Sequence, residues 1–296
     1  MLRSSLLLNP SCFMQPGHPE SVQRSVACME RRTRAGRGTS TAAGGLSVLT
    51  VVLMSSASPA AAQFVCQQYG CSFGGAAAGA RALACGADSI ATGLASSAFG
   101  GQTRAVGDYS TAVGQAARAE GANAVALGSQ SQAIGGNATA IGTVASAAGV
   151  NATSIGNAAS ADGNNGTSMG NGAAASAINS TSVGSNAIAS GLNSTSLGSA
   201  AQVSGANATA IGRGARAVAN SSTAIGDIAR AQGEYSTAIG NDARAMADGA
   251  TATAAAAQAT GLNSSAYGRN ALASQAAATA SGQGSTASGV NSTANG

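Results

Sequence analysis

The side chains that most often carry catalysis are scarce in this chain. Its only histidine is His18, it has no lysine, and its carboxylates do not recur as a pair at a fixed spacing. General acid–base and nucleophilic catalysis need such groups held close together. The sequence therefore predicts no catalytic residues, no cofactor and no metal site, and a protein that is not an enzyme.

The most regularly spaced charged residues are arginines. Arg216, Arg230 and Arg244 follow one another at intervals of fourteen residues, and Arg104 and Arg118 occupy the same position of the pattern. On consecutive strands the first three would form a ladder with about 4.8 Å between steps. Two interpretations stay open, a solvated face partly paired with nearby acids or a stripe that contacts a ligand.

Three cysteines lie beyond the first 62 residues. Cys66 and Cys71 are close enough in sequence to form a disulfide in an oxidising compartment, and we treat this pairing as possible. Cys85 stands where isoleucine or valine recurs elsewhere in the pattern, so we expect a small core residue.

A fourteen-residue repeat contains the arginines. Glycine returns every fourteen residues from Gly86 to Gly296, and only Ala254 breaks the series. We call this glycine the anchor, and we expect it to adopt a positive φ because a turn follows it. A fixed period without insertions indicates a folded repeat protein. The anchors that we single out are Gly142, Gly156, Gly184, Gly198, Gly212, Gly226 and Gly240.

Other positions of the repeat also keep their residue type. A larger apolar side chain precedes the anchor, threonine stands three residues before it, and alanine or serine lies between them. We call the position before the anchor the apolar column. The pattern does not decide whether this column faces its own coil or a threefold axis. Its clearest members are Ile141, Ile155, Val183, Leu197, Ile211, Ile225 and Ile239.

The period-two alternation on both sides of the anchor predicts two strands per repeat, typified by residues 208–212 and 215–219. The connections have about two residues each, so the chain must wind, with each coil pairing with the next. We therefore expect an all-β parallel β-solenoid. Because aromatic residues make up only 3% of the chain and charged residues 8%, a core of large side chains is excluded.

Asparagine followed by any residue and then serine or threonine recurs along the repeat. Most of these triplets begin five residues before an anchor, where a turn into the strand is due. Asparagine favours turns by bonding its own backbone, so we prefer a turn role over glycosylation. The triplets begin at Asn137, Asn151, Asn165, Asn179, Asn193, Asn207, Asn220, Asn263 and Asn291.

Residues 1–62 have the features of an export leader, with Met29 as a possible true start. A basic stretch precedes an apolar run at 46–54, and small residues at Ala60 and Ala62 predict cleavage before Gln63. Six of the 14 basic and two of the ten acidic residues lie in this leader, so residues 63–296 are neutral. A neutral product gives no argument for nucleic acid. We expect residues 63–85 to cap the repeat array of residues 86–296.

The repeats resemble a known family. Asn207-Ala208-Thr209-Ala210-Ile211-Gly212 and Tyr235-Ser236-Thr237-Ala238-Ile239-Gly240 are similar to the head repeats of trimeric autotransporter adhesins of the YadA-like type. The resemblance covers roughly residues 86–296. It implies a left-handed parallel β-roll, a homotrimer, and display on the surface of a Gram-negative bacterium. It also implies attachment to host extracellular matrix, host cells or other bacteria.

The chain departs from the family's full pattern. The sequence shows neither the coiled-coil stalk nor the C-terminal membrane anchor of the family, and we expect it to be a truncated form of a longer protein rather than an anchorless paralogue. Membrane attachment would depend on that missing anchor. A structural surface or fibre protein without a specific ligand is an alternative function. An ice-binding solenoid is a weaker one, because each strand has one threonine instead of two.

Overall fold

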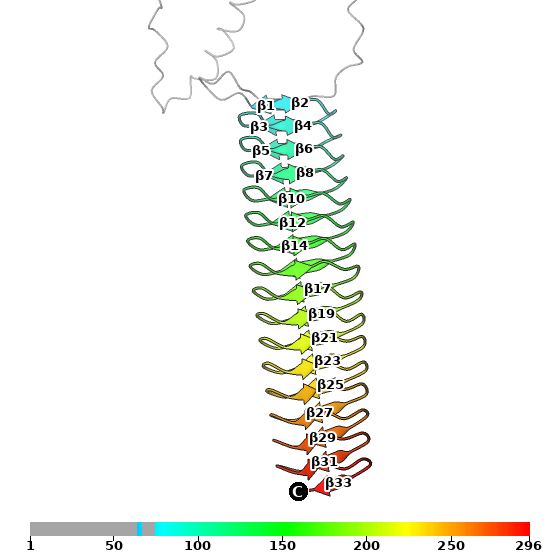
Figure 1. The fold of residues 1–296 in the computed structure, drawn as a ribbon. Coiled ribbons are helices and arrows are strands. Elements are labelled where there is room, and N and C mark those ends of the chain that lie inside the picture. Colours follow the sequence, from blue (N-terminus) through cyan, green and yellow to red (C-terminus); the bar gives the residue numbers. More distant parts are fainter. Residues whose placement is uncertain (1–63, 67–74) are drawn as a thin grey trace, which may run out of the picture. The chain divides into compact units, whose positions relative to one another are not determined.

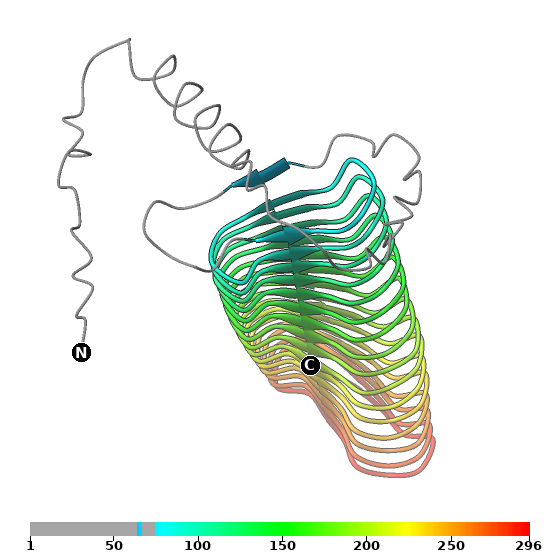
Figure 2. The same cartoon turned by 90° about the horizontal axis from the view of Figure 1, so that it is seen from above.

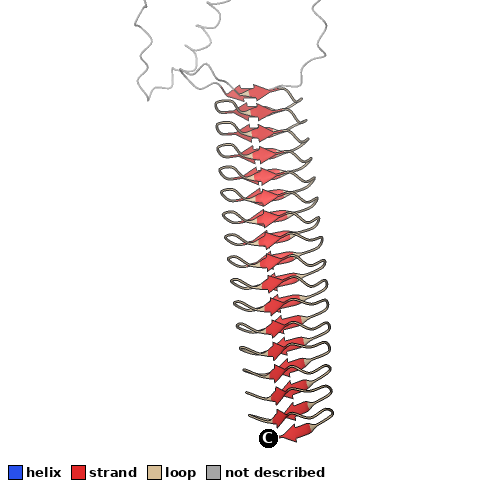
Figure 3. Cartoon of the chain, in the orientation of Figure 1, coloured by secondary structure: helices blue, strands red, loops and turns tan. Residues whose placement is uncertain are grey.

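The computed structural model describes residues 64–66 and 75–296. The predicted leader, residues 1–62, lies outside the described residues, as does Cys71. In the described part, short strands alternate between two sheets, and turns connect them at both edges of the stack (Figures 1 and 3). Figure 2 shows each coil as a flattened loop lying over the next.

The odd-numbered strands form the first sheet. They are β1 (Phe64–Cys66), β3 (Leu83–Cys85), β5 (Ser97–Phe99), β7 (Thr111–Val113), β9 (Val125–Leu127), β11 (Thr139–Ile141), β13 (Thr153–Ile155), β15 (Thr167–Met169), β17 (Thr181–Val183), β19 (Thr195–Leu197), β21 (Thr209–Ile211), β23 (Thr223–Ile225), β25 (Thr237–Ile239), β27 (Thr251–Thr253), β29 (Ser265–Tyr267), β31 (Thr279–Ser281) and β33 (Thr293–Asn295).

The even-numbered strands form the second sheet. They are β2 (Ala76–Ala77), β4 (Ile90–Ala91), β6 (Arg104–Ala105), β8 (Arg118–Ala119), β10 (Gln132–Ala133), β12 (Ser146–Ala147), β14 (Ser160–Ala161), β16 (Ala174–Ala175), β18 (Ile188–Ala189), β20 (Gln202–Val203), β22 (Arg216–Ala217), β24 (Arg230–Ala231), β26 (Arg244–Ala245), β28 (Gln258–Ala259), β30 (Leu272–Ala273) and β32 (Thr286–Ala287).

From β2 onward, neighbouring coils pair in parallel with an offset of fourteen residues, whereas β1 pairs with β3 at a longer offset, with Phe64 opposite Leu83. Ile211 lies opposite Ile225 in the first sheet, and Arg216 lies opposite Arg230 in the second. The prediction of an all-β parallel solenoid with fourteen-residue coils is confirmed. The same offset places Ala76 opposite Ile90, so residues 75–85, expected to be a lead-in, already share the register of the array.

The strands are shorter than the five residues expected from the alternation. The coil around residue 211 has a three-residue strand and a two-residue strand. The turns take up the difference, because Asn207 and Gly214 adopt left-handed conformations with φ of 56° and 64°. Backbone pairing nevertheless continues past the strand ends, since the N–H of Gly212 donates to the carbonyl oxygen of Leu197 at 2.8 Å.

Small side chains fill the space between the two sheets. In one coil the inward residues are Ala208, Ala210, Ala215 and Ala217, all with no exposed surface. Other coils place serine at these positions, and Val203 is the largest fully buried side chain of the described residues. A core lined by alanine and serine lets the two backbone layers approach closely. Larger side chains must therefore lie on the outer faces.

Candidate interaction surfaces

The anchor glycines take a conformation that other residues avoid. The seven anchors singled out in the sequence have φ between 131° and 135°. A Cβ atom built on any of them would lie 2.3–2.6 Å from backbone atoms of the anchor position in the next coil. Glycine is therefore required here both for its backbone conformation and for the close approach of successive coils.

Two further positions of each coil adopt left-handed conformations, one five residues before the anchor and one two residues after it. Asparagine and glycine tolerate this region. Val144 and Ile228 occupy the second position with φ of 59° and 52°. For β-branched residues this conformation is a real outlier, and it carries strain.

The asparagines before the anchors form a hydrogen-bonded ladder along one edge of the stack. The Nδ2 of each donates to the Oδ1 of the asparagine in the next coil, with distances of 2.9–3.1 Å from Asn123 to Asn207. These residues lie in turns, as predicted, but their amides bond along the ladder and not to their own backbone. The run of asparagines in a single column was the sequence signal for the ladder.

The apolar column lies on the outer face of the first sheet. None of its seven singled-out members is buried, and Ile211 and Ile239 are 36% and 39% exposed. Thr209 stands on the same outer face, whereas Ala210 between them points into the core. The column thus forms a continuous apolar stripe from coil to coil, and this chain alone does not cover it.

The three arginines lie on the outer face of the second sheet, the opposite side of the solenoid. Their register places Arg216 next to Arg230 and Arg230 next to Arg244. Arg244 donates from Nε to Asp242 Oδ1 at 3.1 Å and from Nη2 to Asp242 Oδ2 at 3.2 Å. Among the described residues neither Arg216 nor Arg230 has an ion-pair partner. Arg244 fits the interpretation as a solvated, partly paired face, whereas Arg216 and Arg230 remain available to contact a ligand.

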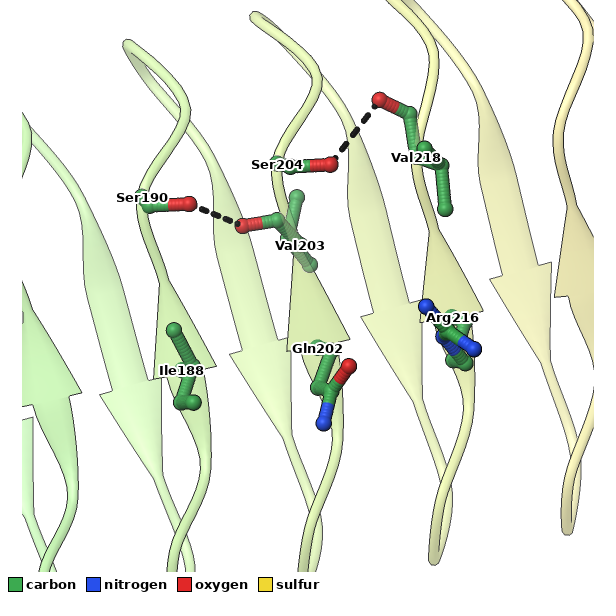
Figure 4. Close-up of a pocket in the computed structure, with 7 residues that line it drawn as sticks. All are labelled: Ile188, Ser190, Gln202, Val203, Ser204, Arg216 and Val218. Atoms are coloured by element: carbon green, nitrogen blue, oxygen red, sulfur yellow. Dashed lines mark hydrogen bonds between the residues drawn. The ribbon is translucent and has the colours of Figure 1, made fainter.

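A shallow depression of about 260 Å³ adjoins Arg216 on this face (Figure 4). Two serine hydroxyls that line it already donate hydrogen bonds within the chain. Ser190 Oγ donates to the carbonyl oxygen of Val203 and Ser204 Oγ to that of Val218, both at 3.1 Å. The sequence analysis missed this depression. Val203, one of its lining residues, replaces the alanine found at the same inward position of the neighbouring coils. The lining residues are Ile188, Ser190, Gln202, Val203, Ser204, Arg216 and Val218.

Cys85 is disulfide-bonded, so its expected role as a small core residue is wrong. Its side chain is also half exposed rather than buried. In the backbone register its partner is Cys66, at the end of β1. The predicted Cys66–Cys71 pairing concerns side chains outside the described residues.

Groups suited to metal binding do not gather in the described part of the chain. Within residues 64–66 and 75–296 no three side chains among histidine, cysteine, aspartate and glutamate lie close enough to hold a metal ion. A search of the same residues also finds no helix with the length and hydropathy to span a membrane.

Comparison with protein families agrees with the coil geometry. The model of the YadA head domain repeat matches overlapping segments that together cover residues 91–255 and 259–296. No curated protein matches the chain. YadA head repeats are structural, non-enzymatic repeats of adhesins that are exposed at the outer membrane of Gram-negative bacteria, so the predicted resemblance and the predicted lack of enzymatic function are confirmed. The chain belongs to the YadA head repeat family.

Proposed function

We propose that the solenoid is the adhesive head of a homotrimer displayed on the surface of a Gram-negative bacterium. In this proposal it attaches the cell to host extracellular matrix, to host cells or to other bacteria. The observation that carries the proposal is the series of YadA head repeats over residues 91–255 and 259–296. The repeats coincide with coils that pair with one another at a constant offset of fourteen residues.

The apolar stripe supports the trimer. Its side chains are half-buried or exposed in the single chain, and contiguous exposed apolar surface marks contacts between proteins. Packing three first sheets around a common axis would cover the stripe on every chain. The second sheets would then face outward, where a ligand can reach them.

A bead assay tests the adhesive function. Beads coated with the purified full-length chain should attach to surfaces coated with matrix proteins, to cultured cells or to one another. Beads coated with the Gly212→Val variant provide the control, because a side chain at this anchor would disrupt the stacking of coils. If a chain shown to be trimeric attached no more strongly than the control in all three assays, the adhesive function would be refuted and a purely structural role would remain.

A further inference from the structure

We propose that the second sheet binds a linear sulfated polysaccharide along a column of five side chains. The column consists of Gln202, Arg216, Arg230, Arg244 and Gln258, and we call it the donor column. The inference rests on the proposed adhesive function, because it requires this face to be exposed outside the cell.

The register makes the donor column continuous. Its members lie on β20, β22, β24, β26 and β28, and each is the direct partner of the next. Consecutive strands are about 4.8 Å apart, so neighbouring side chains are one strand spacing from each other. All five side chains carry N–H donors, and three are positively charged. No other run of five consecutive strands in the described part of the sheet has an N–H donor at every step.

The acidic residues of these coils lie in the turns and not on the sheet. Arg213 Nη2 forms an ion pair with Asp227 Oδ2 at 2.9 Å, and Arg244 forms one with Asp242. Arg216 and Arg230 are left as adjacent like charges without an ion-pair partner among the described residues. Anionic groups placed over these two arginines would relieve their repulsion. The acidic residues of this stretch are Asp227, Glu234, Asp242 and Asp248.

The surroundings of the column favour an extended chain. Ser204 and Val218 beside it are short, and Gln202 and Arg216 border the shallow depression on neighbouring strands (Figure 4). A pyranose chain advances per ring by about the distance between two strands, so successive rings can meet successive donors. Sulfate offers three acceptor oxygens, which suits a site with more N–H donors than a carboxylate can engage.

Nucleic acid fits this face less well. Single-stranded nucleic acids bind by stacking bases on aromatic side chains as well as by charge. The outward positions on the described strands of the second sheet carry no aromatic residue. The donor column therefore supplies charge and hydrogen bonds without a stacking platform.

The full-length chain can be tested against immobilised heparin, with hyaluronan, dextran and a single-stranded DNA oligonucleotide as comparison probes. We expect saturable, salt-sensitive binding to heparin, and weaker or no binding to the others. The double variant Arg216→Gln/Arg230→Gln should weaken heparin binding about tenfold or more, because two charge-assisted contacts are lost.

The matched control is Arg104→Gln/Arg118→Gln. These arginines also lie on adjacent strands at the same position of the repeat, so the net charge changes equally. Arg118 already forms an ion pair with Glu120. The strand neighbour of Arg104 on the other side is Ile90, which has no N–H donor in its side chain, so these arginines do not belong to a five-residue column. The control should stay within about twofold of the unmodified chain.

A second variant, Arg216→Lys/Arg230→Lys, decides the case if the glutamine variant misfolds. It keeps the charges but loses the forked guanidinium donors, so heparin binding should still weaken severalfold. Equal loss in the column variant and the control would overturn the proposal, as would hyaluronan or DNA binding as tightly as heparin through the same arginines. Absence of heparin binding by a chain that still attaches in the bead assay would refute this inference alone. Loss of both would refute the proposed function.

Discussion

At the scale of single residues, the backbone dictates where glycine is needed. A Cβ atom at Gly212 would lie 2.3 Å from the carbonyl oxygen of Gly226, and its φ is 131°. We expect Gly212→Ala to lower the free energy of unfolding by about 3 kcal/mol or more, because strain adds to the clash. Thermal unfolding followed by circular dichroism measures the loss.

Gly136 is the matched control for this substitution. It has no heavy atom within 4 Å of a built Cβ and no positive φ. Gly136→Ala should change stability by no more than about 0.5 kcal/mol, or stabilise slightly by restricting the unfolded chain. Equal losses at both positions would mean that glycine serves only general flexibility in this repeat.

Buried serines provide a second pair of opposite predictions. Ser182 Oγ donates to the carbonyl oxygen of Ala187 at 2.7 Å, whereas Ser196 Oγ has no hydrogen-bond partner among the described residues. The next coil places Ala210 opposite Ser196, which shows that alanine fits this position. Ser196→Ala should raise the melting temperature, and Ser182→Ala should lower it, each by an amount corresponding to about 1 kcal/mol. Shifts of the same sign would contradict the hydrogen-bond assignment.

At the scale of elements, β1 is joined to the array through the first sheet. Its Cys66 lies in register with the disulfide-bonded Cys85. Neighbouring parallel strands bring Cα atoms within the 4.4–6.8 Å that a disulfide requires. We expect the bond to join Cys66 to Cys85 and to attach the first strand to the second coil.

Peptide mapping without reduction identifies the partner of Cys85. A linked peptide pair containing Cys66 and Cys85 is expected, and its mass should separate into two peptides on reduction. Cys71→Ser should leave this pair intact. A peptide pair linking Cys85 to Cys71 would contradict the prediction.

At the scale of the whole molecule, the first sheet should mediate trimerisation. Ile211→Asp/Ile225→Asp places two carboxylates on adjacent strands of each chain, so a threefold axis would gather six. Like charges in a covered interface are strongly unfavourable. We expect this variant to sediment as a monomer or to unfold at a markedly lower temperature, and analytical ultracentrifugation measures the mass.

The control lies in the same coils, directly after β22 and β24 of the second sheet. Val218→Asp/Gln232→Asp adds the same charge, and Val218 is about as exposed in the single chain as Ile211, at 40% against 36%. This variant should remain trimeric. A monomer from both variants, or a trimer from both, would show that the first sheet is not the interface.

The sequence by itself determined the coil. Each anchor glycine occurs at a constant spacing, and a constant spacing forces every strand to pair with the strand one coil away, as Ile211 does with Ile225. Chain order and register therefore followed from the period alone. The period also implied turns at Asn207 and its equivalents, because the residues left between two strands are too few for anything longer.

Only the tertiary structure decided which side of each strand of the first sheet faces inward. Alternation in Thr209-Ala210-Ile211 separates two faces but does not say which is buried, and hydrophobicity alone would favour Ile211. The space between the sheets settles the choice, since it accepts alanine and excludes isoleucine. The same holds for Cys85, because its disulfide depends on atoms brought together by the stacking of coils. A repeat pattern specifies the order and the register of the strands. The volume between the two sheets and the contacts that each side chain can reach are set only when the coils are stacked.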